Sequence, residues 1–185
     1  MPPFTLTRAH ILAAFAPLAE TQNLAARAAF FSHVAPNVVW TVTGSAHALA
    51  GTRTSLRAHT DATFDRLGPR LCGPIQFNVV RVLVDAQPSP IAASSSSSSS
   101  PSSPSTSSPS TSSPSSSPSL SSLHPPENSG QWACVELRGV ATRKASGKPY
   151  VNDYLWLTRW NHQGQIDHVR SYHDTMLAEE VLHGA

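Results

Sequence analysis

The feature that most constrains this chain is a 44-residue tract, from Ala86 to Ser129, that cannot form a packed core. It holds 23 serines and 9 of the chain's 16 prolines, but only one charged residue, Glu127. Serine and proline bury too little apolar surface to offset the entropy lost on ordering, so we expect the tract to be disordered. Subtracting 44 from the 185 residues leaves 141, enough for one domain with its own core. The sequence therefore predicts a single domain, 1–185, interrupted at 86–129.

The residues on either side of the tract alternate as β-strands do. Apolar residues occupy odd positions from Ile75 to Val79, and then even positions at Val82 and Val84. This change of parity indicates a β-bulge, which bends a strand. Apolar or small residues resume at every second position from 133 to 141. The tract is then an expanded hairpin loop, which is tolerated because loop-closure entropy grows only logarithmically with length.

Three helical segments are expected before this sheet. Thr7 can cap the first, which Pro17 should end or kink. The second carries apolar residues from Leu24 to Val34 and must finish before Pro36. The third extends from Leu56 to Leu67, where Gly68-Pro69 stops it.

Further strands are expected at 38–43, 150–160 and 165–172, and Asp174 can cap a closing helix. This order predicts an α+β fold, with helices packed on the concave face of a strongly curved antiparallel sheet. Such a sheet leaves an internal pocket.

Several classes of function receive no support from the sequence. The formal net charge is +2 without a long basic block, which argues against nucleic-acid binding. No apolar run approaches the roughly 20 residues that cross a bilayer. Cys72 and Cys134 should lie on the order of 30 Å apart and remain two free, buried thiols, which favours a cytoplasmic protein. The histidines have no metal-ligand spacing and no cofactor-binding motif is present, so no metal or cofactor is expected.

Two runs of the sequence resemble a known superfamily. They are FSHVAPNVVWTVTGSAHALAG at 31–51 and GKPYVNDYLWLTRWNHQGQIDHVRSYHD at 147–174. Both are similar to the nuclear transport factor 2-like (NTF2-like) superfamily, and within it to SnoaL-like domains related to polyketide cyclases and ketosteroid isomerases. The resemblance covers nearly all of the chain outside the tract. It implies a cone-shaped domain with an apolar pocket at its open end, and dimerisation through the outer face of the sheet.

The same resemblance does not supply a catalytic acid. The aspartate base of the ketosteroid isomerases corresponds to Val42, and their acidic oxyanion donor corresponds to Trp156. The essential aspartate of the epoxide hydrolases and polyketide cyclases corresponds to Ser171. Fold alone does not fix chemistry in such a superfamily.

Strand parity gives a separate prediction of the residues that line the pocket. A four-residue turn at 161–164 would pair Trp156 with Val169, Tyr154 with Ser171 and Asn152 with His173. Cross-strand partners share a face of the sheet. The predicted substrate-binding residues are therefore Trp40, Val42, Asn152, Tyr154, Trp156, Val169 and Ser171. Aromatic residues among them would also suit a packed core.

Two residues are candidates for a general base. The turn at Ser146-Gly147 would set Glu136 near Trp156 on the pocket face, where desolvation raises the pKa of a carboxyl group. His173 is the alternative candidate. Glu136 could instead form a structural salt bridge, for example with Arg138.

Two functions remain open on the sequence alone. The first is a cofactor-free isomerase, cyclase or dehydratase acting on a small apolar organic molecule. The second is a non-catalytic ligand-binding protein or dimeric interaction scaffold of the same fold. A homodimer is expected in either case, because the outward face of the last strands carries Leu155, Leu157, Arg170 and Tyr172.

Overall fold

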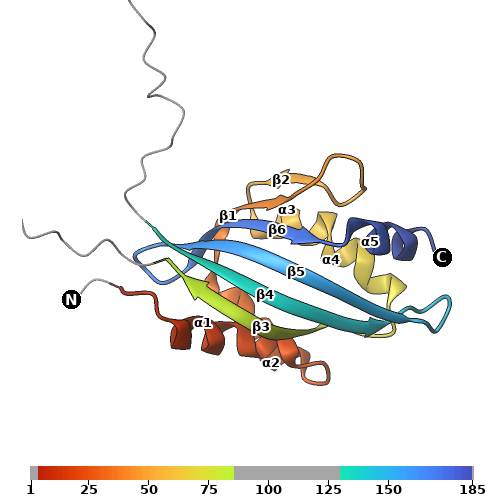
Figure 1. Ribbon diagram of the computed structural model, residues 1–185, viewed down its shortest axis with the longest axis horizontal. Helices are drawn as coiled ribbons and strands as arrows, with labels where there is room; N and C mark the ends of the chain where they lie inside the picture. The colour runs from red at the N-terminus through yellow and green to blue at the C-terminus, as the bar shows by residue number, and fades with distance from the viewer. Residues whose placement is uncertain (1–3, 86–129, 185) are drawn as a thin grey trace, which may run out of the picture. The chain divides into compact units, whose positions relative to one another are not determined.

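The computed structural model describes residues 4–85 and 130–184, which form an α+β domain (Figure 1). The tract at 86–129, for which a disordered loop was expected, lies outside the described residues. Six strands form one sheet in the order β2-β1-β6-β5-β4-β3. Their bounds are β1 Val34–Val42, β2 Gly51–Arg53, β3 Gln76–Val84, β4 Gln131–Thr142, β5 Pro149–Trp160 and β6 Ile166–His173.

The sheet is mixed and not purely antiparallel as expected. β1 pairs with β6 in parallel, whereas every other neighbouring pair is antiparallel. Alternation of apolar residues identifies a strand's inner face, but it is the same for a parallel and an antiparallel neighbour. The direction of β1 therefore had no local signal in the sequence.

The two helix caps expected from the sequence, at the first and the last helix, are confirmed. Thr7 accepts a hydrogen bond from the His10 amide, and Asp174 accepts from the Met176 and Leu177 amides. The helical segments are α1 Arg8–Phe15, η1 Ala16–Ala19, α2 Leu24–Ala28, η2 Ala29–His33, α3 Leu56–Ala62, α4 Phe64–Leu67, η3 Gly68–Arg70 and α5 Thr175–Leu182. Figure 1 shows α1 and α2 along the β3 side of the sheet and α3 beside β1.

Two helical segments are shorter than the apolar spacing predicted. The second ends in a 3-10 turn at His33, and Val34 already belongs to β1. Pro36 lies inside that strand, within the stretch where the register between β1 and β6 is irregular. Proline is tolerated at such an irregularity because it has no N–H to donate to a regular ladder. The third is divided at Thr63, whose backbone leaves the helical region with φ −129° and ψ −75°.

The hairpin that carries the tract closes at its base. The bulge expected after Val79 is confirmed, because the register between β3 and β4 shifts between Val79 and Arg81. Pairing then continues to Val84 and Ala133, and the Asp85 amide donates to the Trp132 carbonyl at 2.9 Å. The described strands are therefore paired up to the point where the tract begins.

The expected pairing of β5 with β6 was wrong by two residues. Trp156 pairs with Ser171 and Tyr154 with His173, not with Val169 and Ser171. The loop holds five residues, closed by a bond from the Asn161 amide to the Gln165 carbonyl, and a bulge follows between Arg159 and Trp160. A shift of two residues leaves every side chain on its expected face.

The expected pairing of β4 with β5 was wrong by one residue, which reverses a face. Trp156 pairs with Val135, and Glu136 pairs with Leu155. The turn begins at Arg143, whose amide donates to the Lys148 carbonyl, and Gly147 closes it with φ +68°. The observed pairing is therefore centred between Ala145 and Ser146, whereas the predicted pairing of Glu136 with Trp156 would be centred on Ser146.

Gly139 is required on the inner face of β4 for packing. A Cβ atom there would lie 2.8 Å from Ile75 Cγ2 and 2.8 Å from Tyr154 Cε2. We expect Gly139→Ala to lower the free energy of unfolding by about 1 to 3 kcal/mol, because these side chains must move apart. Gly73→Ala is the control, since nothing lies within 4 Å of the added methyl group. Urea denaturation of both variants measures the difference, and equal losses would contradict the packing argument.

Two expectations on the protein's surroundings can be compared with the structure. No helix within 4–85 or 130–184 is long and apolar enough to cross a membrane. Cys72 and Cys134 are both free, but Cys72 is exposed and Cys134 only half-buried, whereas two buried thiols were expected.

Candidate functional site

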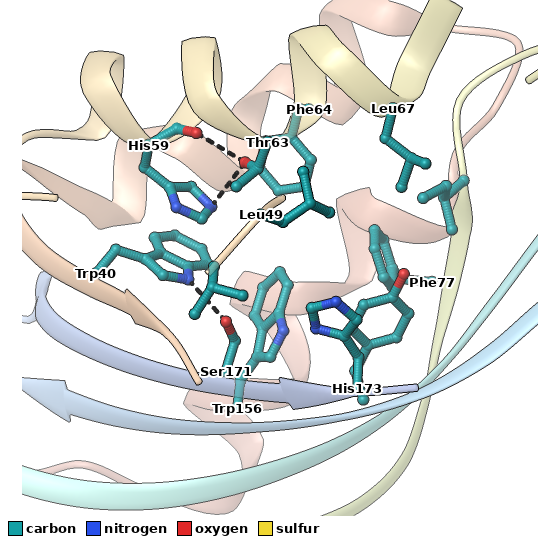
Figure 2. A pocket seen from close by; sticks show the side chains of 13 residues that line it. Trp40, Leu49, His59, Thr63, Phe64, Leu67, Phe77, Trp156, Ser171 and His173 are labelled. Carbon is teal, nitrogen blue, oxygen red and sulfur yellow. Dashed lines mark hydrogen bonds between the residues drawn. The ribbon is translucent and has the colours of Figure 1, made fainter. Parts of the chain in front are cut away.

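A cavity of about 40 Å³ lies between α3, α4 and the inner face of the sheet (Figure 2). Its walls are mostly aromatic and aliphatic, with a hydroxyl or imidazole group at several points. No carboxylate is among the lining residues, which are Trp40, Val42, Leu49, His59, Thr63, Phe64, Leu67, Ile75, Phe77, Tyr154, Trp156, Ser171 and His173. A volume of this size admits a few water molecules.

The cavity brings together most of the residues that the sequence indicated. Trp40, Val42, Tyr154, Trp156, Ser171 and His173 all line it. Two others point inward from the sheet but do not reach the cavity. Val169 is fully buried in the core, and Asn152 is buried and committed to hydrogen bonds.

Glu136 is not in the cavity, so its predicted place on the pocket face was wrong. It lies on the outer face of β4, where its side chain is 41% exposed and 3.7 Å from Arg81 Nε. Its neighbours Val135 and Leu137 are both fully buried on the opposite face. The alternation within β4 is consistent with this outer position, whereas the assumed turn had placed Glu136 on the pocket face. Arg138, the partner considered for it, pairs with Asp153 instead.

One wall of the cavity is built around the indole of Trp40. Its Nε1 donates to Ser171 Oγ at 3.3 Å, and Ser171 Oγ donates in turn to the Thr41 carbonyl at 3.3 Å. The Trp40 ring stacks on His59 with centroids 3.9 Å apart and planes 11° apart (Figure 2). Trp156 meets Trp40 edge-on at 5.1 Å. Ser171 therefore ties β6 to β1, and its proton is already donated to the protein.

His59 is held neutral in this wall. The Thr63 hydroxyl donates its one proton to the His59 carbonyl at 2.7 Å, so it accepts from His59 Nε2, 3.3 Å away. Nδ1 is then an acceptor, and it has no partner within the described residues. Burial, followed by the nearby charge of Arg53, lowers the pKa of His59 to about 3. His59 therefore supplies a flat neutral ring and not a charge.

A chain of hydrogen bonds ends at Tyr154, on another wall of the cavity. Asn152 Nδ2 donates to the Tyr150 oxygen at 3.1 Å, and the two tyrosine oxygens are 2.7 Å apart. When Tyr150 donates to Tyr154, every member is satisfied and the Tyr154 proton is left for a ligand. Burial raises the pKa of Tyr154 well above its usual value, so the phenol stays protonated.

His173 lies opposite Tyr154, its partner across β5 and β6. The two ring centroids are 5.4 Å apart, and His47 meets His173 edge-on at 5.7 Å. Neither ring nitrogen of His173 makes a hydrogen bond to another described residue. Burial and then the neighbouring His47 lower the pKa of His173 to about 4, against the opposing effect of Asp174. Its imidazole is therefore an unoccupied proton acceptor at neutral pH.

A second, larger cavity of about 280 Å³ adjoins the first. Five residues line both, namely Phe64, Leu67, Ile75, Phe77 and Trp156. The remaining walls come from the N-terminal helices, α3, η3 and the segment before β3: Leu18, Arg27, Phe30, Phe31, Thr60, Gly68, Leu71 and Pro74. This volume lies just below the range of roughly 300 to 1,000 Å³ typical of small-molecule pockets.

Helical residues of the cavity were missing from the sequence prediction. Leu56, His59, Thr63 and Leu67 follow one another at spacings of three and four residues, which is one face of a helix. That spacing could have assigned His59 and Thr63 to the face that covers the sheet. Within the described ranges no group of three or more His, Cys, Asp or Glu side chains could hold a metal ion.

Comparison with solved structures shows which fold encloses these cavities. An NTF2-like protein from Burkholderia thailandensis is 18% identical and has a TM-score of 0.56, over 96% of this chain and 98% of that one. An NTF2-like protein from Burkholderia pseudomallei is 10% identical, with a TM-score of 0.54 over 94% and 97%. TerC, co-crystallised with polyporic acid, is 12% identical, with a TM-score of 0.55 over 95% and 96%.

Comparisons with protein-family models and with curated protein sequences found no match. The conclusion therefore rests on the structural similarity, and at sequence identities of 10 to 18% this similarity establishes only the fold. The chain has the NTF2-like fold.

Proposed function

We propose that this chain is a SnoaL-like small-molecule-binding domain, which encloses a largely apolar organic molecule in its two adjoining cavities. The observation that carries the proposal is the composition of the cavity walls. Aromatic and aliphatic side chains supply most of the surface, while Tyr154, His59 and His173 supply a few polar groups directed at one end. This combination is typical of small-molecule sites.

The side chains that line both cavities form a partition between them, and this partition determines how a ligand would enter. Phe64, Phe77 and Trp156 line both spaces, and the space beside Tyr154 and His173 is the smaller. In the proposal the apolar body occupies the larger cavity. Side chains of the partition rotate so that one end of the ligand reaches Tyr154.

A ligand retained during purification tests this proposal. Native mass spectrometry of the purified protein should show a complex heavier than the bare chain by the mass of one small organic molecule. Denaturation should release that molecule. Filling the smaller cavity with Val42→Phe should reduce the bound fraction, whereas a retained mass unaffected by Val42→Phe would contradict binding there.

His173 and Tyr154 favour a second candidate function, cofactor-free acid–base catalysis. A neutral imidazole can accept a proton from a carbon next to a carbonyl group, while a protonated phenol donates a hydrogen bond to the developing oxyanion. Isomerisation, cyclisation and dehydration each begin with such a step. The low pKa of His173 makes it available at neutral pH but also makes it a weak base.

The outer face of the sheet is proposed as a homodimer interface. Leu155 and Tyr172 are paired across β5 and β6, and each is 40% exposed on this face. Ion pairs lie on the same side, from Arg138 to Asp153 and from Arg81 to Glu136. Apolar side chains bordered by charged ones suit a partner that buries the first and leaves the second at the rim.

The assembly prediction is tested by sedimentation. We expect a homodimer at micromolar concentrations in analytical ultracentrifugation, and Tyr172→Glu should convert it to a monomer by burying a charge. Leu24→Glu is the control, because Leu24 is exposed on α2, away from this face. A wild-type monomer at these concentrations would contradict the proposed dimer.

A cytoplasmic location is also part of the proposed function. It is supported by the two free cysteines.

A further inference from the structure

The larger cavity has one charged residue among its lining residues, Arg27 at the end of α2. Its guanidinium carbon lies 5.9 Å from the centre of the Phe77 ring, which belongs to the partition between the cavities. Arg27 is only half-exposed, and burial lowers its pKa, although a guanidinium remains charged in proteins. A cation is therefore placed beside an aromatic cavity.

No carboxylate neutralises this cation within the described part of the chain. Arg27 Nη1 donates to the backbone carbonyls of Leu18 and Glu20, the latter at 3.1 Å. The Glu20 carboxylate makes no ion pair with Arg27, and one of its oxygens accepts from the Gln22 and Asn23 amides at 2.6 and 3.0 Å. Nε and Nη2 of Arg27 make no hydrogen bond to another described residue. The guanidinium thus has donors available for an anion.

We infer that the ligand is an apolar carboxylic acid whose carboxylate binds Arg27. This inference rests on the proposed function, because it concerns the same ligand. A half-buried guanidinium without an acidic partner favours a carboxylate, which it can bind through two parallel N–H···O bonds. The apolar body lies against Phe30, Phe77 and Trp156, and the opposite end points toward Tyr154 and His173. Arg27 then fixes which end of the molecule reaches the imidazole.

A pair of probes that differ in charge tests the inference. 4-Phenylbutanoate and 4-phenylbutan-1-ol share an aromatic body, and only the first carries a carboxylate. Isothermal titration calorimetry should show the wild-type protein binding the acid at least about tenfold more tightly, the usual worth of a charge-assisted hydrogen bond. Arg27→Gln should bring the ratio of the two affinities to about one, because it removes the charge.

Two further variants separate charge recognition from structure. Arg27→Lys keeps a cation and a donor for the Leu18 and Glu20 carbonyls, so it should retain a preference for the acid even if Arg27→Gln folds poorly. Arg57→Gln is the matched control, because Arg57 is an exposed arginine on α3 paired with Asp61, and it should leave the ratio unchanged.

The outcomes distinguish this inference from the proposed function. If wild type binds the alcohol as tightly as the acid, the inference is wrong and the binding proposal stands. If the acid is preferred and Arg27→Gln keeps that preference, the carboxylate binds elsewhere and the inference is wrong. If neither probe binds at millimolar concentration, the inference is wrong, and the mass spectrometry of the retained ligand decides the proposed function separately.

Discussion

Replacing His173 with glutamine should slow proton abstraction from a bound ketone by about 10²- to 10⁴-fold, the usual contribution of a general base. The side chain remains polar and of similar size but loses its proton affinity. A direct assay is deuterium incorporation next to the carbonyl of 4-phenylbutan-2-one in D₂O, followed by NMR. Ligand affinity should change little, because the cavity walls are otherwise unaltered.

The pH profile and a matched variant identify the base in the same assay. The wild-type exchange rate should fall as the pH decreases through about 4, where His173 becomes protonated. Glu136→Gln should exchange at the wild-type rate, since Glu136 lies on the outer face of the sheet. If Glu136→Gln is slow and His173→Gln is normal, the assignment of the base is wrong. A wild-type rate equal to that of buffer contradicts catalysis and leaves binding intact.

Acidification should also destabilise the protein through His59. The pKa of His59 is about 3 in the folded protein, against about 6.5 in the unfolded chain, so the unfolded state binds more protons between these values. Stability from the neutral imidazole is therefore fully present above pH 6.5 and is lost as the pH falls toward 3. Between pH 7 and 4.5 the loss from this residue should be about 2 to 3 kcal/mol.

His59→Phe isolates this contribution, because it keeps a flat ring against Trp40 without a titrating group. The difference in unfolding free energy between wild type and His59→Phe, from urea denaturation, should shift by that amount in favour of the variant at pH 4.5. Val42→Ala is the control, since it removes apolar volume from the same cavity and should cost a similar amount at every pH. Parallel wild-type and His59→Phe curves would show that His59 is not the buried neutral group described.

The fold could be predicted from the sequence where local patterns were sufficient. Thr7 and Asp174 cap their helices as expected, because a cap depends on residues within one turn. The bulge after Val79 was visible as a change of parity within one strand. The parallel contact between β1 and β6 was not visible, since it joins residues more than a hundred positions apart.

The prediction of the candidate site depended on the register between neighbouring strands. That register can be predicted only as accurately as the position and length of the turn that joins the strands. An error of two residues between β5 and β6 still placed Tyr154, Trp156 and His173 on the cavity face. An error of one residue between β4 and β5 placed Glu136 on the wrong face. Arg27 gave no signal at all, because its role depends on a cavity formed by segments distant in the sequence.

The central claim is that a small organic molecule binds inside the domain, and the chain's four tryptophans provide a direct measurement. Trp40 and Trp156 line the cavity. The other two lie outside it: the buried Trp160 indole donates a hydrogen bond to Thr158 Oγ1, and Trp132 packs against His168. In ¹H–¹⁵N NMR spectra, titration with 4-phenylbutan-2-one should shift the indole N–H signals of Trp40 and Trp156 in a saturable manner. The signals of Trp132 and Trp160 should stay in place. Equal shifts of all four signals, or none at millimolar ligand, would contradict a binding site in this cavity.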